Sequence, residues 1–269
     1  MLITKADGNK EGFDKKKIIR TCLRAGADRK TAEEIAGYVE KQINNGDTTR
    51  KIYKLILAEL EKGEDKTAFA YRLREAVSEL PPVTFEHFTK RILELHGYKC
   101  TWNRLIKGEC ITHQVDIVAK KEDKLFLVEC KHHTNHHRLC GLGKALQLWA
   151  RLDDIQNGFK NGKNKYNFTQ AWLFNNTKFS NHVKQYANAK NIKLSGWRYK
   201  GNDSVECMVH EKKVYPITLL KIDSQLKEKL MANNMFTFLD IAHKKDELRK
   251  LVGAKLTNDI LGQVKSCIG

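Results

Sequence analysis

Two acidic residues and a lysine fall in a pair of strongly apolar segments near the middle of the chain. Asp116 lies among Val115, Ile117 and Val118, and a second apolar run, after a charged turn, leads into Glu129, Cys130 and Lys131. This pattern predicts a β-hairpin, and because side chains alternate along a strand, Glu129 and Lys131 should share one face. Two carboxylates at one place are the hard oxygen ligands that Mg²⁺ or Mn²⁺ prefers.

The order of an acid, a spacer and Glu-x-Lys resembles the restriction-endonuclease-like superfamily, whose signature is Pro-Asp, a spacer and (Asp/Glu)-x-Lys. Val115 stands where that family has proline. The resemblance implies that Asp116, Glu129 and the Cys130 carbonyl bind the metal and that Lys131 orients the attacking water. The alternative is that these charges have no catalytic role, because a strand with one solvated face also shows alternating charges. The apolar flanks argue against that alternative, because a buried acid needs a compensating partner.

The same resemblance implies roles in the site for two more polar residues. Glu86 lies one residue from the buried face of a helix predicted to begin at Val83, and it would complete the metal shell; a solvated helix acid is the alternative. Gln147 lies in the helix predicted from Gly143 to Asn157 and would orient water or phosphate. The order of elements and the Glu-Cys-Lys sequence before a Gly-rich helix entry most resemble the Mrr-type branch.

The remaining elements of this region are predicted from hydrophobic periodicity and turn residues. We expect a mixed sheet with strands at 98–105, 109–120, 124–131, 168–174 and 192–197, and a helix at 180–189 capped by Ser180. Residues 203–215 are predicted to form a short terminal hairpin.

The charge of the chain is strongly positive and unevenly distributed. The net charge is +17, and residues 81–216 hold 23 basic and 12 acidic residues, a net charge of +11. Basic side chains around an acidic metal site suit an enzyme that grips a nucleic-acid backbone. Lysine-rich surfaces that serve only solubility are the alternative.

The first 80 residues predict a small helical domain. Its helices should begin near Asp14, near Thr31 and at either Thr48 or Thr49, which are suitable N-cap residues. The segments Ile3-Thr4-Lys5-Ala6-Asp7-Gly8 and Phe13-Asp14-Lys15-Lys16-Lys17-Ile18 resemble the ATP-cone, a regulatory nucleotide-binding module. The resemblance implies that ATP or dATP binds as an effector at Lys5, Asp7, Gly8 and Lys17, with both lysines at the phosphates. An ordinary helical interaction module is the alternative.

Prolines divide the chain into three predicted domains. Pro81-Pro82 and Pro216 separate an ATP-cone at 1–80, a restriction-endonuclease-like α/β domain at 81–216 and an all-α domain at 217–269. In the last domain, helices joined through Gly253 resemble a helix-hairpin-helix module, which grips DNA phosphates through backbone amides. A plain helical or dimerisation domain is the alternative.

The spacing of cysteine and histidine residues is compatible with one further site, for zinc. Cys110-x-x-His113 and His137-x-x-Cys140 could form a tetrahedral zinc site by spacing alone, although His113 is better explained as a satisfied polar residue. For the histidines between His132 and His137, contact with phosphate or DNA, or simple solvation of the loop, is the alternative that the sequence favours. The seven scattered cysteines predict reduced thiols that lie mostly in the core. Without a membrane-length apolar run or a secretory h-region, we expect a cytoplasmic protein.

These features together predict a Mg²⁺-dependent endonuclease of Mrr-like type that acts on double-stranded DNA and responds to an adenine nucleotide. One alternative is a nucleotide-sensing, DNA-binding regulator that no longer cleaves. Another is a repair or junction-resolving nuclease, which dimer symmetry and cleavage of branched DNA would distinguish. Whether the protein forms a homodimer is left open by the sequence.

Overall fold

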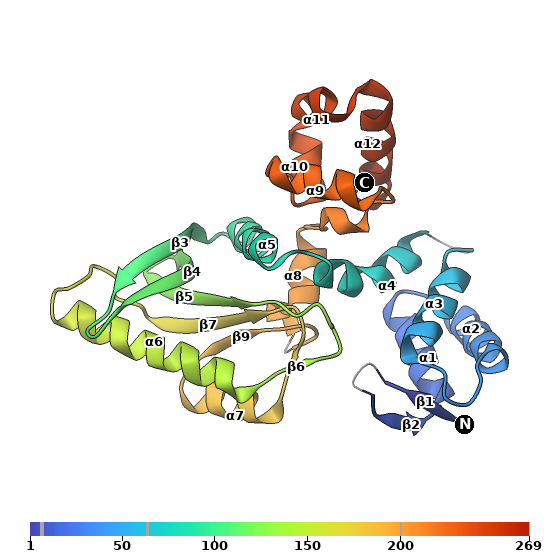
Figure 1. Ribbon diagram of the computed structural model, residues 1–269, viewed down its shortest axis with the longest axis horizontal. Helices are drawn as coiled ribbons and strands as arrows, with labels where there is room; N and C mark the ends of the chain where they lie inside the picture. The colour runs from blue at the N-terminus through green and yellow to red at the C-terminus, as the bar shows by residue number, and fades with distance from the viewer. Residues whose placement is uncertain (6–7, 63–64, 200, 269) are drawn as a thin grey trace. The chain divides into compact units, whose positions relative to one another are not determined.

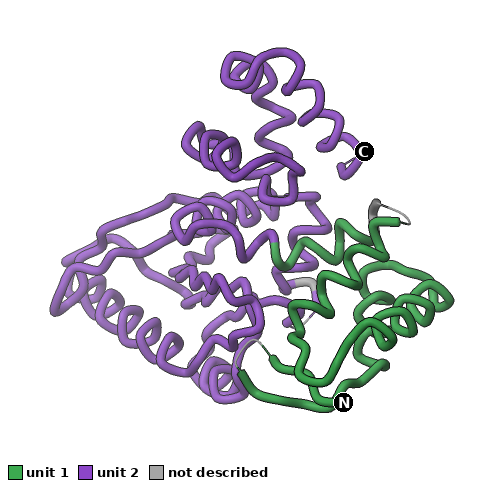
Figure 2. Tube along the Cα trace, turned by 45° about the vertical axis from the view of Figure 1, so that its right-hand side comes forward, with its two compact units in different colours: residues 1–75 green, residues 76–269 purple. Residues whose placement is uncertain are grey.

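A computed structural model describes residues 1–5, 8–62, 65–199 and 201–268. The chain forms two compact units, Met1–Glu75 and Ala76–Gly269 (Figure 2). The predicted domain limits at residues 80 and 216 stay predictions. The predicted class, a multi-domain α/β protein with helical N- and C-terminal parts, is confirmed.

The first unit combines a small hairpin with helices (Figure 1). Strands β1 (Leu2–Thr4) and β2 (Lys10–Gly12) pair antiparallel. The helices are α1 (Lys15–Arg24), α2 (Arg29–Gln42), α3 (Thr49–Leu60) and α4 (Asp65–Ser78), the last of which continues into the second unit. The core comes from one apolar stripe on each helix, including Ile18, Cys22, Ile35, Val39, Ile52 and Ile56.

Two of the three predicted N-caps of this unit are confirmed. The side chain of Asp14 accepts a hydrogen bond from the Lys16 N–H, and that of Thr48 accepts one from the Lys51 N–H. The prediction that Thr31 caps α2 is wrong, because the helix begins one turn earlier. The Asp28 carboxylate accepts hydrogen bonds from both the backbone N–H and the hydroxyl of Thr31, so Asp28 is the N-cap.

The second unit is built on a five-stranded mixed sheet in the order β3-β4-β5-β7-β9. The first three strands are antiparallel neighbours, whereas β5, β7 and β9 run parallel. The strands are β3 (Lys99–Lys107), β4 (Thr112–Lys121), β5 (Lys124–Lys131), β7 (Gln170–Asn175) and β9 (Lys193–Ser195). The predicted mixed sheet is confirmed, and the bounds predicted for β5 are those of the structure.

Helices cover both faces of this sheet (Figure 1). Helices α6 (Leu142–Lys160) and α7 (Asn181–Ala189) lie on one face, and α5 (Pro82–Leu95) lies on the other. The main core forms between the sheet and α6 and α7, from residues such as Leu127, Leu148, Leu152, Leu173 and Val183. Between β5 and α6, the short strand β6 (Leu139–Cys140) pairs parallel with β8 (Lys178–Phe179).

The hairpin predicted for residues 203–215 is wrong. After a 3-10 turn, η1 (Gly201–Asp203), the structure forms helix α8 (Val205–Glu211), and the Ser204 side chain accepts a hydrogen bond from the Cys207 N–H at its start. Val205, Met208 and Val209 are buried at spacings of three and four residues. This helical periodicity prevails over the β-branched composition of the segment.

The C-terminal part is helical, as predicted. A 3-10 turn, η2 (Ile217–Leu219), is followed by α9 (Ser224–Ala232), α10 (Phe238–His243), α11 (Lys245–Val252) and α12 (Ala254–Ile268). Gly253 lies between the last two helices with φ +81°, a conformation that favours glycine. No helix within the described ranges combines the length and apolar character that a membrane crossing requires.

Candidate active site

The two predicted acids lie opposite each other where strands β4 and β5 part. The last pair of their ladder is Ile117 with Val128. Asp116 and Glu129 are the next opposing residues, but their backbones do not pair. On the other side of β4, Asn103 lies opposite Asp116 in a left-handed conformation with φ 51°, and the β3–β4 ladder is also interrupted there. The sheet therefore opens around Asp116.

The Asp116 side chain takes the place of the missing ladder bond. Its Oδ2 accepts a hydrogen bond from the Cys130 N–H at 2.8 Å. In a strand, the N–H and C=O of one residue point toward the same neighbouring strand. The Cys130 carbonyl therefore faces β4 as well, beside Asp116, which agrees with its predicted role as an oxygen donor.

Glu129 is the buried acid of the pair, with a side chain only 6 % exposed. One of its oxygens forms an ion pair with Lys131 and the other with Arg151. The alternation along β5 thus brings Glu129 and Lys131 together as predicted. Arg151 on α6 was not predicted, although one signal was present: it lies four residues after Gln147 and therefore on the same helix face.

The surroundings of this opening in the sheet disfavour the simultaneous ionisation of both carboxylates. Burial, followed by the charge of Glu129, raises the pKa of Asp116 to about 7, although the Cys130 N–H and Lys131 act in the opposite direction. Like charges directly opposite each other on neighbouring strands destabilise a sheet. A cation placed between the carboxylates would remove this repulsion.

Glu86 approaches the same opening from α5. Its Oε2 accepts a hydrogen bond from the Trp102 indole N–H at 2.8 Å, and its charge raises the pKa values of both Asp116 and Cys130. The residue is thus close enough to act on the predicted site, while its carboxylate is oriented by β3.

Gln147 is exposed on α6, where its Oε1 lies 3.5 Å from Lys144 Nζ. It lies one helical turn before Arg151 on the face that reaches Glu129. Among the contacts of the described residues, none joins Gln147 to Asp116 or Glu129. Its assignment to the site stays a prediction.

The donor set fits a hard divalent cation. Asp116, Glu129 and the Cys130 carbonyl supply oxygen ligands only, and Mg²⁺ commonly takes one or two carboxylates and keeps several waters. Within the described part of the chain, no group of three or more His, Cys, Asp or Glu side chains is arranged to hold a metal. A bound cation would therefore depend on the two carboxylates, the carbonyl and water, and it would displace Lys131 or Arg151 from Glu129.

The zinc alternative finds no support in the described residues. His113 Nε2 lies 2.7 Å from Asp154 Oδ2, which confirms that this histidine is a satisfied polar residue. Cys140 is buried in the main core. All seven cysteines are free, but only Cys22, Cys130 and Cys140 are buried, so the expectation that most lie in the core is wrong.

In the first unit, the two lysines predicted to bind phosphate are brought together. Lys5 Nζ and Lys17 Nζ lie 2.7 Å and 3.1 Å from the same oxygen of Glu11. Hydrogen bonds from Lys5, followed by those from Lys17, outweigh burial and lower the pKa of Glu11. Gly8 follows β1 with φ +85°, and Asp7 lies outside the described residues.

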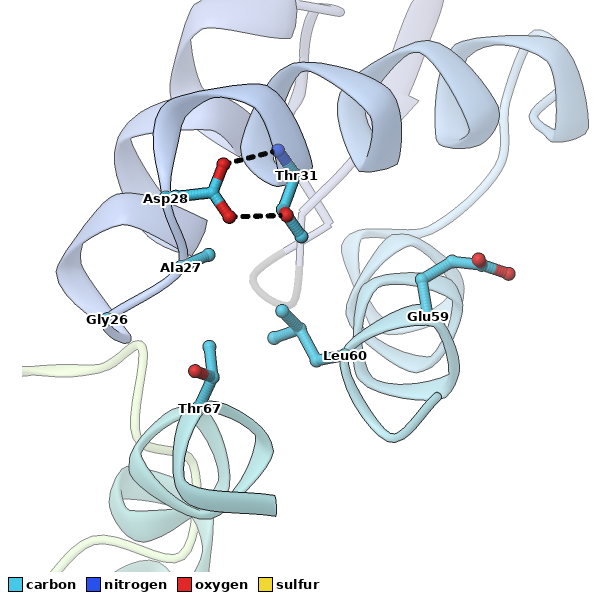
Figure 3. A pocket seen from close by; sticks show the side chains of 7 residues that line it. All are labelled: Gly26, Ala27, Asp28, Thr31, Glu59, Leu60 and Thr67. Carbon is cyan, nitrogen blue, oxygen red and sulfur yellow. Dashed lines mark hydrogen bonds between the residues drawn. The ribbon is translucent and has the colours of Figure 1, made fainter. Parts of the chain in front are cut away.

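A pocket of about 310 Å³ lies elsewhere in this unit (Figure 3). Figure 3 shows Asp28 turned toward Thr31, with Glu59 on the neighbouring helix. The lining residues are Gly26, Ala27, Asp28, Thr31, Glu59, Leu60 and Thr67. Acidic and hydroxyl groups do not suit a polyphosphate, and neither Lys5 nor Lys17 lines the pocket, so it is distinct from the predicted nucleotide residues.

Two protein families match successive parts of this chain. Residues 1–77 match the family described as "ATP cone domain" and residues 77–196 match the family described as "Restriction endonuclease". An uncharacterized protein of Archaeoglobus fulgidus is 33% identical over 181 residues, which are 66% of this chain and 99% of the relative. A second one from that organism is 46% identical over 44 residues, 16% of this chain and 94% of the relative.

A solved structure resembles the chain over much of its length. The crystal structure described as "Protein of Unknown Function AF1548" has a TM-score of 0.59 and 31% sequence identity, and the match covers 69% of this chain and 97% of that one. With the two family matches along residues 1–196, the chain belongs to the family in which an ATP-cone domain is joined to an Mrr-type restriction endonuclease domain.

Proposed function

We propose that this protein is a Mg²⁺-dependent endonuclease that hydrolyses phosphodiester bonds of double-stranded DNA. The observation that carries the proposal is the opposition of Asp116 and Glu129 where β4 and β5 part, with Lys131 and Arg151 against Glu129. Two acids in a partly buried position are unfavourable for a structural role, because each raises the energy of the other's ionised form.

The residues of the site have distinct proposed roles. Asp116, Glu129 and the Cys130 carbonyl would hold the cation, which when bound polarises the phosphate and activates water. Lys131 would orient the attacking water through its ammonium group. Arg151, whose planar guanidinium is suited to phosphate oxygens, would stabilise the added negative charge of the pentavalent transition state.

Two outlying residues complete this assignment. Glu86, oriented by Trp102, would hold a water of the cation's shell. Gln147 would contact water or phosphate from the helix turn next to Arg151. Both assignments rest on family resemblance together with their positions on α5 and α6.

The rest of the molecule supports nucleic acid as the partner. The net charge of +11 between residues 81 and 216 favours DNA through release of counterions. The helix–Gly253–helix arrangement of α11 and α12 is proposed to bind the DNA backbone through amide groups near its turn.

The ATP-cone is proposed to regulate the nuclease. Adenine nucleotide phosphates would bind Lys5 and Lys17 and displace Glu11 from both lysines. For regulation, ATP or dATP must bind two states of the protein with different affinity.

The test is cleavage of supercoiled, linear, methylated and branched DNA in Mg²⁺ or Mn²⁺, with and without ATP and dATP. Asp116→Ala and Lys131→Ala should each abolish cleavage, whereas Lys160→Ala, which removes an exposed lysine at the far end of α6, should leave it unchanged. Cleavage that persists in both site variants would refute the assignment of the active site.

The non-cleaving regulator remains the second candidate because both oxygens of Glu129 are engaged by Lys131 and Arg151. If these ion pairs persist when DNA and cation are added, the carboxylate cannot bind metal. Wild-type protein that binds DNA but cleaves no substrate in either metal would establish the regulator.

A further inference from the structure

Strands β3 and β4 continue as a two-stranded ribbon past the point where β4 leaves β5. Pairing of β4 with β5 begins at Ile117, whereas residues 112–115 of β4 pair with residues 104–107 of β3. β3 is an edge strand of the sheet (Figure 1). The ribbon, residues 104–107 and 112–115, therefore starts directly beside Asp116 of the proposed active site.

One face of the ribbon is held against α6 and the segment that follows it. Ile106 is buried in the main core, and His113 lies against Asp154 of α6. The Asn164 side chain donates a hydrogen bond to the Lys107 carbonyl at 2.8 Å. These contacts fix the ribbon before any partner binds, so its other face is a preformed surface.

The opposite face of the ribbon is exposed and chemically mixed. Because Leu105 pairs with Gln114 and Lys107 pairs with Thr112, these four side chains alternate with Ile106 and His113 and share the outer face. All four residues are exposed. Leu105, at 72 %, is the most exposed large apolar residue in the described part of the chain. The outer face thus presents an aliphatic group, a cation, a hydroxyl and an amide.

The charge of the ribbon favours a polyanionic partner. Arg104 and Lys107 are exposed and form no ion pair with any residue that the structure describes. Glu109, the acid of the turn, lies 2.7 Å from Lys163. Asn103, directly before the ribbon, has φ 51° and interrupts the strand. Such an interruption and like charges along an edge strand hinder its pairing with a second copy.

We propose that the outer face of the ribbon enters the major groove of duplex DNA and reads base edges next to the cleaved phosphodiester bond. The major groove accommodates a two-stranded β-ribbon. There the Gln114 amide would pair with N6 and N7 of an adenine, and Leu105 would contact a thymine methyl group. Arg104 and Lys107 would contact phosphates on either side. The inference rests on the proposed nuclease function and assigns the groove that this nuclease reads.

The ribbon also sets the distance between base reading and cleavage. Gln114 precedes Asp116 by two residues and Thr112 precedes it by four. These separations correspond to about 7 Å and 14 Å along a strand. Because base pairs follow each other at about 3.4 Å, the base pairs that the ribbon contacts should lie about two to four steps from the cleaved bond.

Selection from duplexes with a randomised segment tests whether the ribbon reads sequence. Binding is carried out in Ca²⁺, which occupies oxygen sites with little cleavage, and the bound duplexes are sequenced. Gln114→Ala should reduce the base preference about tenfold at one or two adjacent positions, and Leu105→Ala should reduce it at a neighbouring position. Leu23→Ala, which removes an exposed leucine from α1, is the matched control and should keep the wild-type preference.

Base analogues in the selected duplex identify the groove. Uracil in place of thymine removes the methyl group and 7-deazaadenine removes N7, both in the major groove, whereas 3-deazaadenine removes N3 in the minor groove. Uracil should weaken binding by wild type but not by Leu105→Ala. Likewise, 7-deazaadenine should weaken binding by wild type but not by Gln114→Ala. Sensitivity to 3-deazaadenine alone would overturn the assignment to the major groove.

The basic residues of the ribbon should act on all sequences alike. Arg104→Gln and Lys107→Gln should each weaken binding to every duplex and reduce the slope of log affinity against log salt by about 1. Lys30→Gln, which removes an exposed lysine from α2, should keep the wild-type slope. Unchanged slopes in both ribbon variants would contradict their contact with phosphates.

The outcomes separate this inference from the nuclease function. Wild type that cleaves DNA, but whose base preference is absent or is retained in both Leu105→Ala and Gln114→Ala, would overturn the inference and leave the nuclease function intact. A wild-type dimer that Leu105→Ala dissociates without a change in base preference would assign the ribbon to self-association. Wild type that binds no duplex would refute the nuclease function itself.

Discussion

At the scale of single residues, the proposed active site is a balance of opposite charges around Glu129. Lys131 and Arg151 neutralise this carboxylate on one side, and Asp116 repels it on the other. In the proposed function, a metal ion that binds Glu129 would have to displace Lys131 or Arg151 from this carboxylate. The affinity for such a cation would therefore depend on the residues that compete with it for Glu129.

Arg151→Gln should bind Mg²⁺ more tightly than wild type while cleaving DNA more slowly. Removing a partly exposed ion pair of roughly 1 kcal/mol corresponds to about fivefold in affinity. Isothermal titration of Mg²⁺, or of Mn²⁺ followed by electron paramagnetic resonance, measures the first effect. Equal affinity in the variant and wild type would show that Arg151 does not compete for Glu129.

Asp116→Asn should raise the thermal stability of the metal-free protein at pH 8. The amide oxygen can still accept the hydrogen bond from Cys130, while the repulsion with Glu129 disappears. Melting in EDTA measures this change. Addition of Mg²⁺ should stabilise wild type and have little effect on the variant, because binding stabilises only the state that binds. A lower melting temperature for the variant in EDTA would contradict the repulsion.

At the scale of elements, helix α6 carries Arg151 at a position fixed by its contact with the turn between β3 and β4. Gly158 packs so closely that a Cβ there would lie 2.6 Å from the carbonyl carbon of Gly108 and 2.9 Å from the Glu109 nitrogen. One turn earlier, Asp154 accepts hydrogen bonds from the Cys110 N–H and from His113. These contacts fix the position of α6 relative to the turn between β3 and β4.

Gly158→Ala should destabilise the protein by about 1–3 kcal/mol, the range for overpacking against a rigid neighbour. The helix propensity of alanine offsets at most about 1 kcal/mol of this loss. Gly143→Ala is the control in the same helix, because apart from its own stretch of helix no atom lies within 4 Å of its added Cβ, and it should be neutral or stabilising. Urea unfolding of both variants gives the comparison; equal stability would contradict the close contact.

Asp154→Asn should lose stability at neutral pH but match wild type in strong acid. Burial favours a raised pKa for Asp154, but the Cys110 N–H and then the His113 side chain outweigh it and lower the pKa. A lowered folded-state pKa adds stability above the unfolded value of about 3.9, and this stability is lost as the pH falls below it. Denaturant unfolding from pH 2 to pH 7 measures the difference, and a constant difference across this range would refute the mechanism.

At the scale of the whole second unit, α5 joins the sheet to the C-terminal helices. The His87 ring lies 4.3 Å from Trp102 on β3 and stacks at 5.0 Å and 8° on Phe236 before α10. Arg91 Nε also lies 3.7 Å from Asp240 Oδ1. Glu86, next to His87, is oriented by the same Trp102. The proposed DNA-binding helices are thereby connected to one wall of the proposed active site.

Phe236→Ala should loosen the C-terminal helices without unfolding the sheet. Loss of a half-buried ring amounts to about 2 kcal/mol, below the range for a fully buried one. Hydrogen exchange should accelerate in α10 to α12 and stay unchanged in β4 and β5. Phe236→Tyr, which retains the stacked ring, is the control. Uniform acceleration through the whole unit would instead mean that these elements unfold together.

The sequence alone determined the features that depend on local pattern. Alternation along the apolar run before Lys131 fixed the bounds of β5 and the shared face of Glu129 and Lys131, and side-chain oxygens at Asp14 and Thr48 fixed two helix starts. The ATP-cone and the nuclease domain were recognisable from short motifs. Sequence prediction was wrong where a segment suits two kinds of element. The residues after Ser204 suit a strand by composition, but their buried positions follow the spacing of a helix.

Only the tertiary structure decided which distant groups meet. Arg151 reaches Glu129 because α6 packs on the face of β5 that carries this acid, and the carboxylates oppose each other because the register that pairs Ile117 with Val128 places Asp116 opposite Glu129. Glu11 lies between Lys5 and Lys17 through the pairing of β1 with β2 and the approach of α1. Such contacts join segments whose spacing along the chain carries no periodic signal, so only the packing of the elements specifies them.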